Sequence, residues 1–284
     1  MKFAAHLLSS MMLVFLSQAA FAFPLAQPGQ NLLTPMASNT AGYDFEGIVA
    51  LSNCSGGLIQ LETSRDTDLA LVLTNGHCYE YGFIADGKVI VDQPSRRRFQ
   101  LMDSQAKTVG TLNATKVVYA TMTKTDMTIY QLQETYAEIK TKYNIRPLML
   151  SARPPLVKDA TQILSGYWRK GYSCGIDAII EKLKEGDWTC EQSFRYSQPG
   201  CETIGGTSGS PVILTGTRTV IGVNNTGNEN GEACTENNPC EVDSHGNISY
   251  QKGYSYGQQT YWLYSCLSDT NQLDLNKPGC LLPH

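Results

Sequence analysis

Histidine is scarce in this chain of 284 residues, so each copy can be weighed as a possible proton acceptor. The four histidines stand at positions 6, 77, 245 and 284. His77 directly follows the apolar run "LALVLTNG", and Cys78 comes next. His245 lies in the turn sequence "DSHGN", where we expect an exposed loop residue. His77 is therefore the candidate general base, since imidazole titrates near neutral pH.

A carboxylate and a hydroxyl complete a set that could cleave an acyl bond. Asp126, in "KTDMTIYQL", precedes an alternating apolar run and can turn inward to orient an imidazole. Ser208 lies in "GGTSGSPV", where a tight turn can present its hydroxyl while backbone N–H groups point at the same spot. Steps of 49 and 82 residues separate the histidine, the aspartate and the serine, in that order. The set indicates nucleophilic catalysis by the serine.

These motifs together resemble the trypsin-like, or chymotrypsin-fold, serine peptidases, especially their secreted bacterial members. "CSGGLI" with "LTNGHC" is similar to the family's cysteine-glycine-glycine strand and its active-site histidine strand. "TDMTIYQL" is similar to its aspartate strand, and "GTSGSPV" to its nucleophile loop. The resemblance spans roughly residues 46 to 226, and the tail from about 227 matches only loosely.

The resemblance implies a role for each residue of the set. Ser208 would be the nucleophile, His77 the general base and then acid, and Asp126 the orienting carboxylate. The backbone N–H groups of Gly206 and Ser208 would form an oxyanion hole. Ser210 is a rival hydroxyl, but it aligns with the small residue after the nucleophile's glycine. The resemblance implies no cofactor and no metal.

Substrate preference is less well defined by the resemblance. Glu202 falls, by counting, at the acidic pocket base of trypsin, which would favour Lys or Arg. Thr203 matches a threonine of bacterial glutamyl endopeptidases, but Asn224 stands where those enzymes bind the substrate carboxylate through a histidine. These three residues are the substrate-binding candidates. Thr207 replaces the aspartate that pairs with a new N-terminal ammonium in animal members, so we expect activity without that ion pair.

The elements that must position these residues have the pattern of strands. Short runs rich in Val, Ile, Tyr and Thr, such as "GIVALS", "TKVVYATM" and "SPVILTG", alternate with turns, which is typical of sandwiches or barrels. The resemblance implies an all-β fold of two six-stranded antiparallel barrels packed side by side, with a few short helices. Helical periodicity appears only within 134–143, 176–186 and 256–267.

A break in the apolar pattern divides the predicted barrels. The sequence "SARPPLVKD", with Pro154 and Pro155, suits a linker. We therefore predict a first barrel over 46–150, with the histidine and the aspartate. The second barrel, over 151–284, would hold the serine and a disulfide-rich tail.

The N-terminus has the features of a secretory signal. A mostly apolar stretch, residues 7–16, precedes "SQAAFAF", whose alanines have the A-x-A spacing of a cleavage site. We predict a signal peptide over 1–22 and an N-terminal arm or propeptide over 23–45. No later stretch approaches the roughly 20 apolar residues of a membrane span. We expect a secreted or periplasmic monomer with no membrane contact.

The nine cysteines fit an oxidising compartment. Near neighbours suggest the disulfides Cys54–Cys78, Cys234–Cys240 and Cys266–Cys280. Cys174, Cys190 and Cys201 are left to supply one further pair and one odd thiol. Zinc binding is disfavoured because the chain has no C-x-x-C pair and only His77 lies beside a cysteine.

Charge excludes a class of partner. The net charge is −4, which gives no basic face for nucleic acid. Arg96, Arg97 and Arg98 are expected at a solvated strand end or turn. The Asn-rich stretch 227–247 is expected to be a disulfide-tied loop, with calcium binding as the alternative.

The predicted function is that of a secreted serine endopeptidase, which hydrolyses peptide bonds through an acyl-enzyme and binds protein or peptide substrates. The alternative is a catalytically inactive homologue that acts as a binding or adhesion module. Such proteins typically lose a triad member, whereas all three candidates are present here. An esterase is disfavoured because its G-x-S-x-G elbow belongs to an alternating α/β chain.

Overall fold

A computed structural model describes residues 42–284, which contain sixteen strands and two short helices. The predicted signal peptide and nearly all of the predicted arm lie outside these residues. Within them, neither helix has the length and hydrophobicity of a membrane span.

Six antiparallel strands close the first barrel. They are β1 (Ile48–Ala50), β2 (Ser55–Gln60), β3 (Leu69–Thr74), β5 (Arg98–Met102), β6 (Thr108–Thr121) and β7 (Met127–Thr135). The strands follow the order β1, β5, β6, β7, β3, β2, and β2 pairs back onto β1. An additional strand, β4 (Val89–Pro94), pairs with β6.

A second closed ring of six antiparallel strands follows. It contains β9 (Ala160–Ser165), β10 (Lys170–Glu185), β11 (Trp188–Tyr196), β12 (Pro211–Leu214), β13 (Thr219–Gly227) and β16 (Ser255–Gln259). The order is β13, β12, β9, β10, β11, β16, and β16 pairs back onto β13. The predicted fold of two six-stranded barrels is confirmed.

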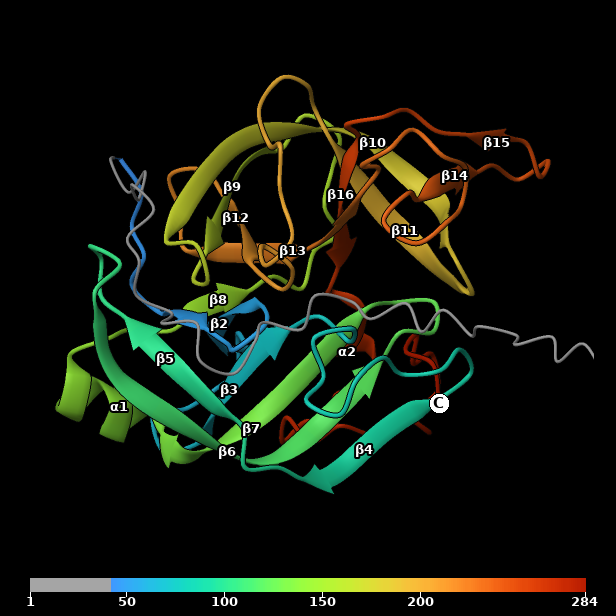
Figure 1. The fold of residues 1–284 in the computed structure, drawn as a ribbon. Helices are drawn as coiled ribbons and strands as arrows, with labels where there is room; N and C mark the ends of the chain where they lie inside the picture. The colour runs from blue at the N-terminus through green and yellow to red at the C-terminus, as the bar shows by residue number, and fades with distance from the viewer. Residues whose placement is uncertain (1–41) are drawn as a thin grey trace, which may run out of the picture. The chain divides into compact units, whose positions relative to one another are not determined.

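Three further strands extend or join the barrels. β8 (Leu148–Leu150) pairs in parallel with β2 of the first barrel and with β13 of the second (Figure 1). β14 (Cys240–Val242) pairs with β10, and β15 (Ile248–Ser249) pairs with β14. The loop 227–247 is thus tied to the long β10 strand as well as by its own disulfide.

Apolar side chains that alternate along the strands fill the barrels. In the first barrel, Leu58, Val72 and Tyr130 come from three different strands and are fully buried in one cluster. Burying a side chain such as that of Leu58 contributes roughly 2 kcal/mol. In the second barrel, Ile163 and Val212 occupy paired positions of β9 and β12 in the same way.

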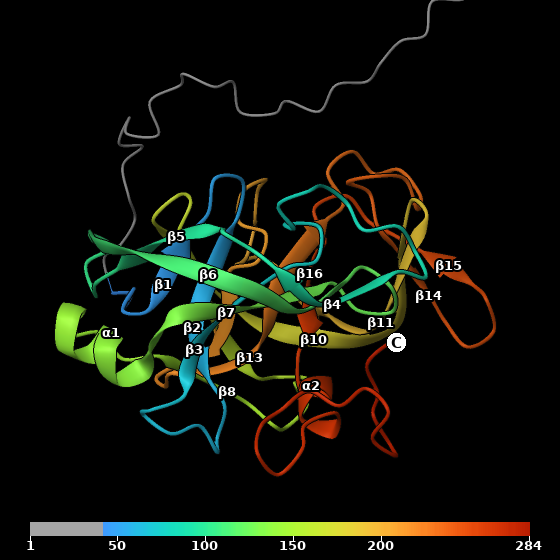
Figure 2. The ribbon, with the colours of Figure 1, turned by 90° about the horizontal axis from the view of Figure 1, so that it is seen from below.

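One of the three predicted helices is confirmed. α1 (Tyr136–Tyr143) begins after Thr135, whose hydroxyl accepts from the Glu138 N–H while the Glu138 carboxylate accepts from the Thr135 N–H. Asn144 ends it in the left-handed conformation. Figure 2 shows α1 at the end of β7.

The other two helix predictions are corrected. Residues 176–186 belong to β10 and the turn after it, because this segment pairs with β11 and β14, and such pairing overrides local periodicity. A bulge between Ile176 and Ala178 shifts the register and leaves buried positions at a helix-like spacing. Residues 256–267 contain most of β16 and only one turn of helix, α2 (Trp262–Ser265).

The four disulfides include the three predicted pairs and settle the pair that the sequence left open. Cys54–Cys78, Cys234–Cys240 and Cys266–Cys280 are present as predicted. Cys174 pairs with Cys201, and Cys190 is the free, buried thiol of residues 42–284.

The C-terminal tail returns to the first barrel. Trp262 and Leu263 of α2 are buried in one cluster with Ile129 of β7. The Tyr119 hydroxyl of β6 donates to the Pro283 carbonyl over 3.0 Å. The tail therefore contacts the first barrel, and the same buried cluster also includes Val220 and Val223 of the second barrel.

Candidate active site

Strand pairing brings His77 and Asp126 together. Thr74 at the end of β3 pairs with Thr128 near the start of β7, so the residues after β3 meet those before β7. His77 Nδ1 lies 2.7 Å from Asp126 Oδ2, and the His77 backbone N–H donates to Asp126 Oδ1 over 2.9 Å. One carboxylate thus orients both the ring and the backbone of the histidine.

Neighbouring residues hold this pair in place. The Asn75 side-chain amide donates to the Asp126 carbonyl over 2.9 Å. Gly76 allows the close approach, because a Cβ there would lie 1.9 Å from the Thr121 carbonyl oxygen. Any larger residue at position 76 would push the histidine turn away from the carboxylate.

The electrostatics of the site favour the protonated imidazole. Burial of the ring lowers the pKa of His77, but the charge of Asp126, its hydrogen bond and the charge of Glu185 raise it. The net result is a pKa above the usual range for histidine. The arrangement therefore stabilises the imidazolium that forms when His77 accepts a proton.

Arg97 supports the same corner, in contrast to the prediction of a solvated position. Its side chain is only 7% exposed, whereas Arg96 and Arg98 are exposed as expected. The guanidinium donates to the Cys78 carbonyl, and to the Tyr130 hydroxyl over 3.0 Å. Arg97 is buried because the Cys78 carbonyl and the Tyr130 hydroxyl accept its hydrogen bonds. These acceptors come from distant segments, so the sequence alone does not reveal them.

The nucleophile candidate lies on a loop that packs against the same turn. Gly209 has φ of +76°, and a Cβ there would lie 2.1 Å from Thr74 Oγ1, so both conformation and space require glycine. The Ser208 carbonyl accepts from the Ser55 N–H over 2.8 Å. The Ser208 hydroxyl donates to the Asn225 carbonyl over 3.4 Å, and among residues 42–284 it has no hydrogen bond with His77.

The backbone N–H groups of Gly206 and of Ser208 have no acceptor in residues 42–284. The peptide planes that carry them are fixed from the opposite side. Trp168 Nε1 donates to the Gly205 carbonyl over 2.7 Å, and the Ser210 N–H donates to the Thr207 carbonyl over 3.1 Å. Because a trans peptide directs N–H and C=O in opposite directions, both N–H groups remain available to an anion.

The three substrate-binding candidates differ in burial and hydrogen bonding. Glu202 is exposed and Thr203 is partly buried, and neither has a hydrogen bond within the described chain. Asn224 is buried, and its side-chain amide donates to Thr207 Oγ1 over 3.1 Å. His245 is exposed on its loop, as predicted.

Sequence reasoning missed Glu185, which lies at the end of β10. Its carboxylate accepts from the Asn237 N–H over 2.7 Å and interacts electrostatically with His77 and Asp126. Burial raises the pKa of Glu185 to about 7, against hydrogen bonds from Thr226 and Asn237 that lower it. The prediction of a helix over this segment hid the residue, because a helix would not bring it to the histidine.

An aromatic contact covers the other side of His77. The Phe83 ring meets the imidazole edge to face at 6.2 Å and the Trp188 ring at 5.6 Å. Trp188 Nε1 donates to the Ile84 carbonyl over 2.8 Å. These residues tie the β10–β11 hairpin to the segment after the histidine.

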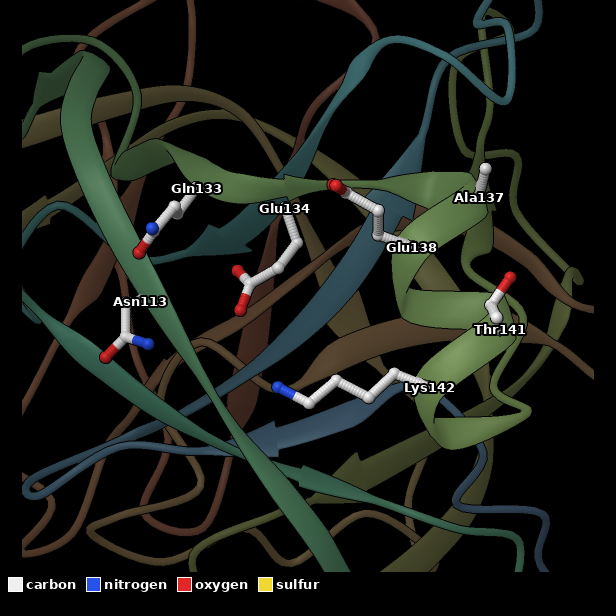
Figure 3. A pocket seen from close by; sticks show the side chains of 7 residues that line it. All are labelled: Asn113, Gln133, Glu134, Ala137, Glu138, Thr141 and Lys142. Carbon is white, nitrogen blue, oxygen red and sulfur yellow. The ribbon is translucent and has the colours of Figure 1, made fainter.

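Within residues 42–284, neither the cluster of Cys54, His77 and Cys78 nor a surface hollow offers a second site. Donor atoms of Cys54, His77 and Cys78 lie within 4.8 Å of one another, but the two sulfurs form a disulfide and supply no thiolate ligand. A hollow of about 690 Å³ lies between α1, β6 and the end of β7 (Figure 3). None of the predicted site residues lines it; its lining is Asn113, Gln133, Glu134, Ala137, Glu138, Thr141 and Lys142.

Comparison with known proteins gives one family match. A model of the trypsin-like peptidase domain matches residues 54–223, more than half of the chain. The fold is similar to the MamO protease domain from Magnetospirillum magneticum in its apo form, with 12% identity, coverage of 81% of this chain and 100% of that chain, and a TM-score of 0.49. It is also similar to the Rv3671c protease from M. tuberculosis in its active form, with 16% identity, 87% coverage of each chain and a TM-score of 0.45. A search of curated proteins gave no significant match.

Proposed function

This chain belongs to the trypsin-like peptidase family, and we propose that it is a serine endopeptidase with Ser208, His77 and Asp126 as its catalytic triad. The observation that supports the proposal most is the 2.7 Å contact of His77 Nδ1 with Asp126. This contact leaves Nε2 as the proton acceptor and fixes the ring orientation.

Acylation would begin with a rotation of the Ser208 hydroxyl from the Asn225 carbonyl toward His77. Nε2 accepts the hydroxyl proton while Oγ attacks the carbonyl carbon of the scissile peptide bond. The substrate oxygen gains the negative charge and accepts hydrogen bonds from the N–H groups of Gly206 and Ser208. The imidazolium then gives its proton to the leaving nitrogen, the C–N bond breaks, and an acyl-enzyme remains.

Deacylation would use the same groups, with water in place of the serine hydroxyl as the nucleophile. His77 removes a proton from water, and the resulting oxygen nucleophile attacks the ester carbon. The second tetrahedral intermediate collapses, His77 returns a proton to Ser208 Oγ, and the carboxylic acid product leaves. Glu202 and Thr203 remain candidates for contact with the substrate side chain.

Export is part of the proposal. Four disulfides in residues 42–284 fit a secreted or periplasmic location. The proposal adds that the protein is a monomer that acts on protein or peptide substrates. Removal of residues 1–22 would leave a protein that begins at Phe23, which N-terminal sequencing of the exported chain would check.

Substitution of the triad tests the activity. Ser208→Ala and His77→Ala should each lower the turnover of a peptide library by roughly 10⁶-fold and abolish fluorophosphonate labelling. Ser210→Ala and His245→Ala are matched controls that should keep substantial activity. An active Ser208→Ala protein beside an inactive Ser210→Ala protein would reject the assignment. A wild-type protein that neither reacts with the phosphonate nor cleaves any peptide would favour the inactive binding module.

A further inference from the structure

The Thr207 side chain is held at two points directly beside the nucleophile. Its hydroxyl donates to the Ile204 carbonyl over 2.5 Å, so the single hydroxyl proton is used there. The oxygen accepts from Asn224 Nδ2 over 3.1 Å. Both residues are only 1% exposed, and this geometry fixes which way the Asn224 amide faces.

Asn224 also holds the loop through its backbone. Its N–H donates to the Ser210 carbonyl over 2.8 Å, and its carbonyl accepts from the Gly209 N–H over 2.9 Å. One residue of β13 therefore contacts the residues before and after Ser208. Thr207 carries the carbonyl of the peptide unit whose nitrogen belongs to Ser208, so a fixed Thr207 side chain helps fix the direction of the Ser208 N–H.

We propose that the buried Asn224–Thr207 hydrogen bond positions the oxyanion-binding N–H groups, and that Asn224 is a positioning residue rather than a substrate-binding one. The inference rests on the proposed function, because it assigns a task to that loop in catalysis. The pair is uncharged, and the Thr207 hydroxyl both donates and accepts a hydrogen bond without a terminal ammonium, whereas the buried Asn224 Oδ1 has no partner in the described chain. Preorganised donors of this kind act mainly on the transition state.

Two nearly isosteric variants remove the bond from either side: Thr207→Val and Asn224→Leu. Each should lower kcat by about 10²-fold, the effect of a small misplacement of catalytic groups, while KM changes by less than about threefold. Thr207→Ser keeps the hydroxyl and should retain kcat within about threefold of the wild type. The double variant should be no worse than the more damaged single one, since both remove one interaction.

Controls separate positioning from folding. Rates are divided by the concentration of active sites, obtained by fluorophosphonate titration, so that unfolded protein does not count. Ser210→Ala is the matched control: its hydroxyl is fully buried in the same loop and has no partner in the described chain. The pH profile should keep the acid limb of the wild type, because His77 is not changed. Thr207→Ala serves in place of the valine variant if that protein does not fold.

The outcomes distinguish this inference from the proposed function. Normal kcat per active site in Thr207→Val and Asn224→Leu, with Ser208→Ala inactive, would overturn the positioning role alone. Strictly additive losses in the double variant would overturn it as well. Full activity of Ser208→Ala would instead reject the proposed function.

Discussion

Glu185 is the residue whose charge reaches His77 from outside the proposed triad. Its negative charge stabilises the imidazolium and so contributes to the raised pKa of His77. The pKa of Glu185 is itself raised to about 7, so protonation of Glu185 near neutral pH would weaken the effect of its charge on His77. The activity of the enzyme should therefore depend on both groups between mildly acidic and neutral pH.

Glu185→Gln should shift the acid limb of the kcat/KM profile to lower pH. The neutral amide removes a charge that favours protonated His77, so the pKa of His77 falls and the neutral base persists in more acidic solution. A pH series from 4 to 9 would measure this shift. An acid limb that moves to higher pH, or does not move, would contradict the electrostatic coupling. Glu191→Gln, on the same hairpin but paired with Lys124, is the control.

Among the elements, β2 and the turn after β3 are joined by a disulfide beside the proposed active site. Cys54 directly precedes β2, and Cys78 follows His77. Their bond therefore joins the histidine turn to the strand that also receives the nucleophile loop, through the Ser55 N–H and the Ser208 carbonyl. Removing it should affect both folding and activity.

Replacing Cys54 and Cys78 together by Ala should lower the free energy of unfolding by about 3 kcal/mol, because the bond closes a separation of 24 residues. The same change at Cys234 and Cys240, which lie 6 residues apart, should cost about 2 kcal/mol and leave kcat nearly unchanged. Urea unfolding and peptide hydrolysis measure the two effects. Equal losses of kcat in both variants would argue against a special role for the first bond.

The strands were predictable from sequence where each carries its own signal. The runs around His77, Asp126 and Ser208 alternate or end in characteristic turns, and the motif after β3 lies beside the motif before β7, as expected. β10 was not predictable, because its pairing with β11 and β14 is a long-range property. The orientation of Asn224 and the burial of Arg97 likewise depend on partners from distant segments.

At the scale of the whole described chain, ion pairs join the residues before β1 to distant segments. The Glu46 carboxylate lies 2.7 Å from the Arg146 guanidinium and 3.1 Å from that of Arg218. Burial raises the pKa of Glu46, but its hydrogen bonds with Arg146 and the charges of both arginines lower the pKa by more than burial raises it. The net result is a lowered pKa. Arg218 also pairs with Asp44, and β1 follows immediately.

Glu46→Gln should destabilise the protein at neutral pH and less so in acid. A carboxyl with a lowered folded pKa stabilises the native state above its ordinary value near 4.5, and this contribution is lost as pH falls below it. Thermal unfolding of both proteins between pH 3 and 7 should give curves that converge toward the acidic end. A difference that grows as pH falls would contradict the assignment. The exposed Arg146 side chain keeps the expected effect small.

The single free thiol of the described chain can be used to measure slow local opening of the fold. Cys190 lies at a buried position of β11, and burial together with the charges of Asp126 and Glu185 raises its pKa well above the ordinary value. Thiolate is therefore rare while the barrel is closed, and an alkylating reagent can react only when β11 separates from its neighbours. The rate of iodoacetamide labelling should thus report how often β11 separates from its neighbouring strands. A phosphonate bound covalently to Ser208 should slow that labelling, because the occupied site would hold the barrel closed. Fast labelling of the native protein would show that β11 opens without global unfolding.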